Sequence, residues 1–114
     1  MPSPGTYNMV VPQSTTYTFI CKIQEDSTPW DLTGYTGVMT VRPFLGSTTT
    51  TLEATTANGK MSLGTSNGRI TITFTALDTT IKAESYVYDI VLSSGGIITR
   101  ILEGQFIVTA GVTV

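Results

Sequence analysis

The chain has 114 residues, of which 40% are apolar and 12% charged, and it carries a net charge of −2 with no cluster of Lys and Arg. This composition excludes a disordered chain and supplies one core without disulfides, so we expect a single domain spanning residues 1–114. Nucleic acid and membranes are not expected as partners, because the bases are scattered and no apolar run is long enough to span a bilayer.

Strands are expected throughout, because 23 Thr together with Val and Ile make the chain rich in β-branched residues. Alternating apolar and polar residues predict seven to nine strands. In chain order the candidates are Tyr7–Val11, Thr15–Gln24, Gly37–Pro43, Thr50–Ala54, Lys60–Leu63, Gly68–Phe74, Tyr86–Leu92, Ile97–Leu102 and Gln105–Thr109. Turn residues at Asn58–Gly59, Ser66–Gly68 and Ser94–Gly96 predict antiparallel connections. We expect Ala76–Ala83 to be a single-turn connection.

The faces of these strands predict two packed sheets. Ile70, Ile72 and Phe74 share one side of their strand, whereas the strand with Tyr86 and Tyr88 is apolar on both sides except at Asp89. Short strands with frequent turns favour an all-β, immunoglobulin-like antiparallel β-sandwich over a small barrel. The predicted core comprises Trp30, Leu32, Ile70, Ile72, Phe74, Tyr86 and Tyr88.

Trp30 and Tyr86 each have a second interpretation beside their place in the core. Trp30 and Leu32 would close one end of the core, and a surface Trp30 that anchors a ligand is the alternative. Tyr86 follows the Leu77–Thr79 corner, so its hydroxyl is expected to bond that corner, as in a tyrosine corner.

Catalytic chemistry is not expected, because the chain has no His and therefore lacks the commonest general base and zinc ligand. Three acids, Glu25, Asp26 and Asp31, could offer oxygen ligands, but their spacing is not that of a calcium loop, and we expect a polar loop without metal or cofactor. Asp89 should need a cation, and Arg42 or Arg100 could supply a structural ion pair.

The expected compartment is a cytoplasm. The residues from Met1 to Gly5 lack the charged and apolar regions of a signal peptide. The lone Cys21 agrees, since it cannot form an intramolecular disulfide and lies in an alternating stretch where a buried, inert thiol is expected.

The first strand candidate is a possible contact with another subunit. Tyr7, Met9, Val10 and Val11 form an apolar segment without a charge to discourage strand pairing at a sheet edge. The alternative is that this segment packs within its own sheet.

An ordered set of short motifs resembles a known family. The motifs are Trp30–Tyr35, Val41–Pro43, Gly68–Ile72, Tyr86–Ile90 and Arg100–Gly104. In order and spacing they resemble the immunoglobulin-like domain of phage baseplate upper proteins and similar small stand-alone virion proteins.

The resemblance implies a virion structural protein, made in the host bacterial cytoplasm and bound to other virion proteins, with homo-oligomerisation inside the particle expected. A tail, baseplate or fibre adaptor is the implied role. The alternatives are a capsid decoration or neck protein, and a carbohydrate-binding or adhesive module with aromatic side chains exposed on one surface.

Overall fold

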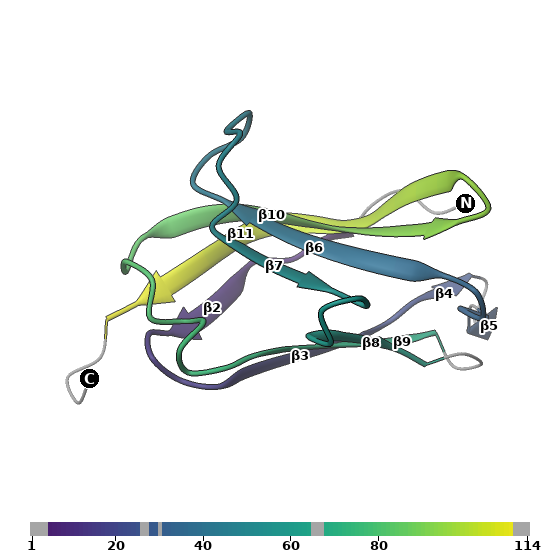
Figure 1. Ribbon diagram of the computed structural model, residues 1–114, viewed down its shortest axis with the longest axis horizontal. Helices are drawn as coiled ribbons and strands as arrows, with labels where there is room; N and C mark the ends of the chain where they lie inside the picture. The colour runs from purple at the N-terminus through teal and green to yellow at the C-terminus, as the bar shows by residue number, and fades with distance from the viewer. Residues whose placement is uncertain (1–4, 26–27, 30, 65–67, 111–114) are drawn as a thin grey trace.

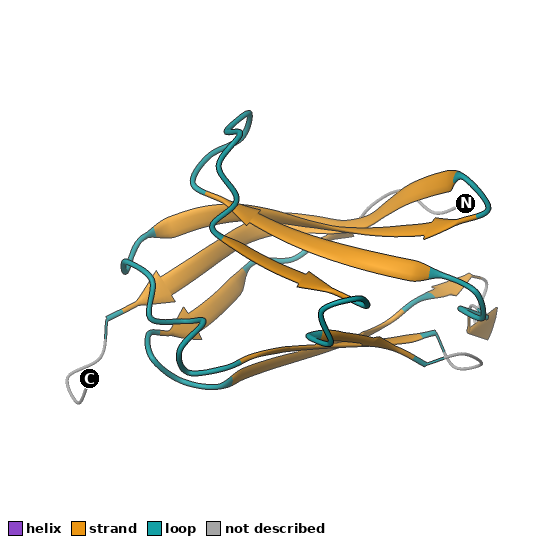
Figure 2. Cartoon of the chain, in the orientation of Figure 1, coloured by secondary structure: helices purple, strands orange, loops and turns teal. Residues whose placement is uncertain are grey.

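The computed structural model describes residues 5–25, 28–29, 31–64 and 68–110 (Figure 1). Every regular element in these ranges is a strand (Figure 2), so none is a helix that could cross a membrane. The strands are β1 Gly5–Thr6, β2 Met9–Pro12, β3 Tyr17–Lys22, β4 Gln24–Glu25, β5 Thr28–Pro29, β6 Thr36–Arg42, β7 Leu52–Thr55, β8 Met61–Leu63, β9 Arg69–Phe74, β10 Ser85–Ser94 and β11 Ile97–Thr109.

Nine of these strands form two sheets that pack face to face (Figure 2). The larger sheet has the order β1-β11-β10-β6-β7, with β2 also paired to β11, and the smaller has the order β3-β9-β8. β4 and β5 form a separate two-stranded hairpin. The fold is therefore all-β, an immunoglobulin-like β-sandwich, as the sequence predicted.

The predicted antiparallel sandwich has an exception at the N-terminus. Both β1 and β2 run parallel to β11, with Gly5 opposite Leu102 and Met9 opposite Phe106. Parallel pairing is possible here because almost the whole chain separates the first strands from the last, which gives ample length for the crossover.

The two strands predicted at Ile97–Leu102 and Gln105–Thr109 are one continuous strand, β11. The glycine between them, Gly104, does not end the strand, because its backbone is extended and pairs with Tyr88 on β10. The irregularity lies earlier, where Ile90 pairs with Leu102 but Val91 pairs with Arg100. The extra residue makes a β-bulge there.

The core lies between the sheets and contains the predicted residues that the structure describes. Leu32, Ile70, Ile72, Phe74, Tyr86 and Tyr88 are all buried, whereas Trp30 lies outside the described residues. Met9, Val11, Met39, Val41, Ile90, Leu92 and Phe106 join them. The rings of Phe74 and Phe106 meet edge to face, with centroids 5.8 Å apart, and so connect the two sheets.

The strand β10 lies in the middle of the larger sheet but is buried on one face only, although its sequence is apolar on both sides except at Asp89. Tyr86, Tyr88, Ile90 and Leu92 face the core, whereas Val87, Asp89 and Val91 are partly exposed on the outer face. The run of apolar residues on its second face therefore belongs to a surface that solvent reaches.

A tyrosine corner lies at the start of β10. The hydroxyl of Tyr86 donates a hydrogen bond of 2.7 Å to the carbonyl oxygen of Lys82, four residues upstream, and not to Leu77–Thr79 as predicted. The segment Ala76–Ala83 contains one turn, at residues 76–79, followed by bends, in agreement with the expected single-turn connection. Thr79, fully buried, fastens it to the chain before β3 by donating to the carbonyl oxygen of Thr15 at 2.7 Å.

Candidate functional site

A loop of residues 43–51 between β6 and β7 stands away from both sheets (Figure 1). Gly46, with φ of 90°, makes the turn at its tip, a backbone conformation that glycine adopts without strain. Two hydrogen bonds close its base, from Arg42 Nη1 to Thr50 Oγ1 at 3.3 Å and from Thr51 N to the Val41 carbonyl oxygen at 2.7 Å. The loop is therefore anchored at its base.

Two large apolar side chains are exposed on this loop. Phe44 is 62% and Leu45 91% exposed. They were not predicted as site residues, although two consecutive large apolar residues between strands, in a Thr-rich stretch, indicate an exposed apolar patch. Isolated exposed apolar residues are ordinary, but an adjacent pair on a projecting turn forms a patch that a partner can cover.

The loop and the outer face of the larger sheet enclose a groove of about 670 Å³. The side chains of β6, β10 and β11 that point outward form its floor, and Phe44 and Leu45 form one wall. The groove is lined by Thr6, Thr40, Arg42, Phe44, Leu45, Gly46, Ser47, Thr48, Val87, Tyr88, Asp89, Arg100, Glu103 and Gly104. Its volume falls within the range of ligand sites in proteins.

Charges of both signs face each other across the floor of the groove. Asp89 and Glu103 lie directly opposite on β10 and β11, an arrangement that is unfavourable for two carboxylates. Arg100 offsets it, with Nε 3.1 Å from Asp89 Oδ2 and Nη1 3.9 Å from Glu103 Oε1. The predicted Asp89 ion pair is thus confirmed with Arg100. Asp89 is not buried, however, since its side chain is 33% exposed.

The predicted edge segment divides between core and surface. Met9 and Val11 are fully buried and pair through β2 with β11, whereas Tyr7 is 50% and Val10 57% exposed. Tyr7 packs on Phe19 of the other sheet, with ring centroids 5.4 Å apart. The segment therefore packs within its own sheet through β11. No described strand pairs with the other side of β2, so its use as a contact edge stays a prediction.

The carboxylates considered as metal ligands do not form a site in the described part of the chain. Asp26 lies outside the described residues, and the side chain of Glu25 is also outside the description. Asp31 Oδ1 accepts hydrogen bonds from Thr33 Oγ1 at 2.6 Å and Thr33 N at 3.0 Å, and these bonds lower the pKa of its carboxyl. No cluster of three potential metal ligands occurs in residues 5–25, 28–29, 31–64 and 68–110.

Cys21 is a partly buried free thiol on β3, and burial raises its pKa. In immunoglobulin domains a Cys two residues after the corner tyrosine forms a disulfide between the sheets. Here that position holds Tyr88, whose hydroxyl donates to the carbonyl oxygen of Tyr7 at 2.6 Å. A tyrosine that hydrogen-bonds to the N-terminal segment therefore occupies the position of the disulfide-forming Cys.

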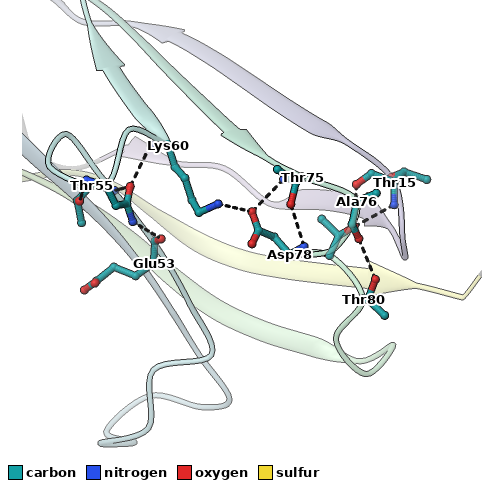
Figure 3. Close-up of polar contacts among 10 residues, drawn as sticks. Thr15, Glu53, Thr55, Lys60, Thr75, Ala76, Asp78 and Thr80 are labelled. Carbon is teal, nitrogen blue, oxygen red and sulfur yellow. Dashed lines mark hydrogen bonds and ion pairs between the residues drawn. The ribbon is translucent and has the colours of Figure 1, made fainter.

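A second polar cluster is structural. Lys60 Nζ lies 2.6 Å from Asp78 Oδ2, which also accepts a hydrogen bond from Thr75 N at 2.9 Å (Figure 3). Nearby, Asn58 Nδ2 donates to the Glu53 carbonyl oxygen at 3.0 Å. These contacts fasten the turns after β7 and β9 and use the polar groups that a ligand would need.

Comparisons with known proteins identify no family for this chain. No protein-family model matches the chain, and no curated protein matches it. Among solved structures, the chain is similar to the extracellular domains of the voltage-gated sodium channel beta4 subunit. The similarity covers 98% of each chain, with 6% sequence identity and a TM-score of 0.49. A likeness at this level carries no information about function.

Proposed function

We propose that this chain is a bacteriophage virion structural protein, a tail, baseplate or fibre adaptor that acts through protein–protein contacts and not through catalysis. The resemblance of the ordered motifs to phage baseplate upper proteins supports the virion setting. The observation that carries a contact role is the adjacent pair Phe44 and Leu45, exposed on a turn that is anchored at its base.

Physical chemistry explains why such a turn suits assembly. A few side chains buried at the centre of an interface contribute most of its binding energy, and neighbouring polar groups give orientation and specificity. Phe44 and Leu45 supply the first element, and the charged floor with Asp89, Arg100 and Glu103 supplies the second. An already folded support loses little conformational freedom when the partner binds.

Mass spectrometry of purified phage particles, with heads and tails separated on a gradient, tests this proposal. A few to some tens of copies with tails are expected for an adaptor. Hundreds of copies with heads would indicate the alternative, a capsid decoration or neck protein. Absence from particles of a phage that encodes the chain would refute a virion role.

A carbohydrate-binding module is the second candidate, and one observation favours it. Phe44 lies beside polar groups of the groove, and glycan sites combine an aromatic face with such groups. Tyr86 and Tyr88 are buried, and Tyr17 and Tyr35 are partly buried against the core. Of the described tyrosines, only Tyr7 is largely exposed, and it packs on Phe19 away from this groove. Binding on a glycan array that disappears in folded Phe44→Ala or Trp30→Ala protein would favour this function over assembly.

A further inference from the structure

The strand β3, Tyr17–Lys22, forms one edge of the smaller sheet. It pairs with β9 on one side, and no described strand pairs with its other side. Proteins usually protect such an edge with Pro, bulges or several charges. β3 contains no Pro or Gly, its register with β9 is regular, and it carries one charge, on Lys22. It is therefore an open template for a further strand.

The hydrogen-bond pattern identifies the backbone groups that face this open side. Ile23 N donates to the Gly68 carbonyl oxygen at 2.8 Å, in the same register as the β3–β9 pairing. In an antiparallel pair, hydrogen-bonded positions alternate with positions whose groups point away. The odd-numbered residues of β3 therefore bond to β9. Thr18, Ile20 and Lys22 direct their N–H and C=O groups to the open edge.

The other side of β9 supports this assignment. Gly64 N donates to the Arg69 carbonyl oxygen at 2.7 Å, and Thr73 N donates to the Lys60 carbonyl oxygen at 2.9 Å. The odd-numbered residues of β9 thus bond towards β8. The even-numbered residues of β9 are left to bond to β3, as the Ile23–Gly68 bond requires.

The side chains along the edge are also exposed. Thr18, Ile20 and Lys22 point to the outer face of the smaller sheet, and Ile20 is 55% exposed. A hollow of about 430 Å³ adjoins this edge, with Tyr7, Phe19, Ile20 and Cys21 in its lining. An added strand would cover the hollow as well as pair with the backbone.

We propose that a second copy of this chain pairs with the β3 edge, antiparallel and about a two-fold axis at Ile20. In this register Ile20 lies opposite Ile20 of the second copy, and Thr18 lies opposite Lys22 of the second copy. All three outward-facing residues then form hydrogen-bonded pairs, each of which exchanges two hydrogen bonds. The smaller sheets of two copies become one continuous sheet with the order β8-β9-β3-β3-β9-β8.

Self-complementarity favours a second copy over a foreign strand. The register places the exposed apolar side chain against its own equivalent, and it sets Lys22 against a neutral Thr and not against another Lys. If the pairing shifted by one residue, the free N–H and C=O groups of one copy would lie opposite odd-numbered residues of the other copy. The backbone groups of those residues are already bonded to β9. The inference names a partner for the assembly role proposed above, but its test uses the isolated protein. A negative result therefore leaves the virion proposal standing.

Oligomeric state and amide hydrogen exchange test this dimer directly. Sedimentation over micromolar to millimolar protein should give a monomer–dimer equilibrium, with the amides of Thr18, Ile20 and Lys22 protected only in the dimer. Ile20→Lys places like charges opposite each other and should weaken dimerisation at least tenfold. The control Ser62→Lys adds the same charge on β8, across the sheet, and should dimerise as the parent does.

A pair of cysteine variants tests the register. In a Cys21→Ala background, Ile20→Cys should form a disulfide-linked dimer on mild oxidation, because directly opposite residues lie within disulfide reach. Thr18→Cys should not, because the two copies of residue 18 are far apart along the paired strands. Equal cross-linking of both variants would overturn the register.

A monomer at millimolar concentration would overturn the proposal of a dimer. A dimer weakened equally by Ile20→Lys and Ser62→Lys would also overturn it. Protection of the β3 amides only after addition of another virion protein would assign the edge to a foreign strand instead.

Discussion

Replacing Gly104 by alanine should destabilise the protein by displacing its N-terminal segment. A Cβ at position 104 would overlap the carbonyl oxygen of Tyr7, lie 2.8 Å from the Tyr7 carbonyl carbon and come within 3.1 Å of Asn8 Oδ1. Most of this obstruction is backbone, so a rotamer change cannot relieve it. The segment must move, and the hydrogen bond from the Tyr88 hydroxyl to the Tyr7 oxygen should weaken with it.

The expected cost combines these two effects. Overpacking costs about 1–3 kcal/mol, and a lost buried hydrogen bond costs about 1 kcal/mol, so the free energy of unfolding should fall by about 2–4 kcal/mol. For a domain of this size, that corresponds to a decrease in Tm of roughly 10 °C or more. Equilibrium urea unfolding of the parent and the variant measures the difference.

The hydrogen-bond contribution can be separated with Tyr88→Phe, which should cost about 1 kcal/mol alone. Adding Tyr88→Phe to Gly104→Ala should then cost less than it does in the parent, because the bond is already weakened. A change below about 0.5 kcal/mol for Gly104→Ala, within the usual range of neutral surface substitutions, would refute the reasoning.

Three further outcomes are expected. Tyr86→Phe removes the hydrogen bond to Lys82 and should lower the free energy of urea unfolding by about 1 kcal/mol, and an unchanged midpoint would contradict a structural corner. Burial alone would raise the pKa of Asp78, but the hydrogen bonds it accepts, led by that from Lys60, outweigh burial and lower the pKa. Its stabilisation is therefore present above the unfolded carboxyl pKa of about 3.9 and is lost as the pH falls through the lower folded value. Asp78→Asn should flatten the acid limb of the plot of stability against pH, and an unaltered limb would argue against this pair. Because burial raises the pKa of Cys21, its folded-state reaction with a disulfide reagent at pH 8 should be slower than in urea, and equal rates would show that the thiol is open to solvent.

Local sequence patterns were sufficient to predict the two packed sheets. The alternation of Ile70, Ile72 and Phe74 places one face of β9 in the core, and the structure buries all three. Alternation works in this case because one face of the strand is buried and the other is not, so the side-chain pattern fixes the orientation of the strand. The sequence also predicted an ion pair of Asp89 with Arg42 or Arg100, and the structure shows the pair with Arg100.

Contacts between distant parts of the chain could not be predicted in this way. The parallel pairing of β2 with β11 joins Met9 to Phe106, and no local pattern specifies such a partner. The sequence predicted two strands separated near Gly104. A glycine is required there because a Cβ would collide with the backbone of Tyr7, and this contact is visible only in the folded structure. The groove was missed for the same reason, since its floor comes from three strands and its wall from a separate loop.

The most direct test of the assembly role compares two variants in a phage that encodes the chain. Leu45→Asp places a charge at the exposed tip of the 43–51 loop, and Leu77→Asp places the same charge at a residue that is 83% exposed on the turn between β9 and β10. Particles should contain the Leu77→Asp protein at the parental copy number and should lack most of the Leu45→Asp protein, although both fold. Equal incorporation of the two proteins would contradict the assignment of this loop as the assembly contact.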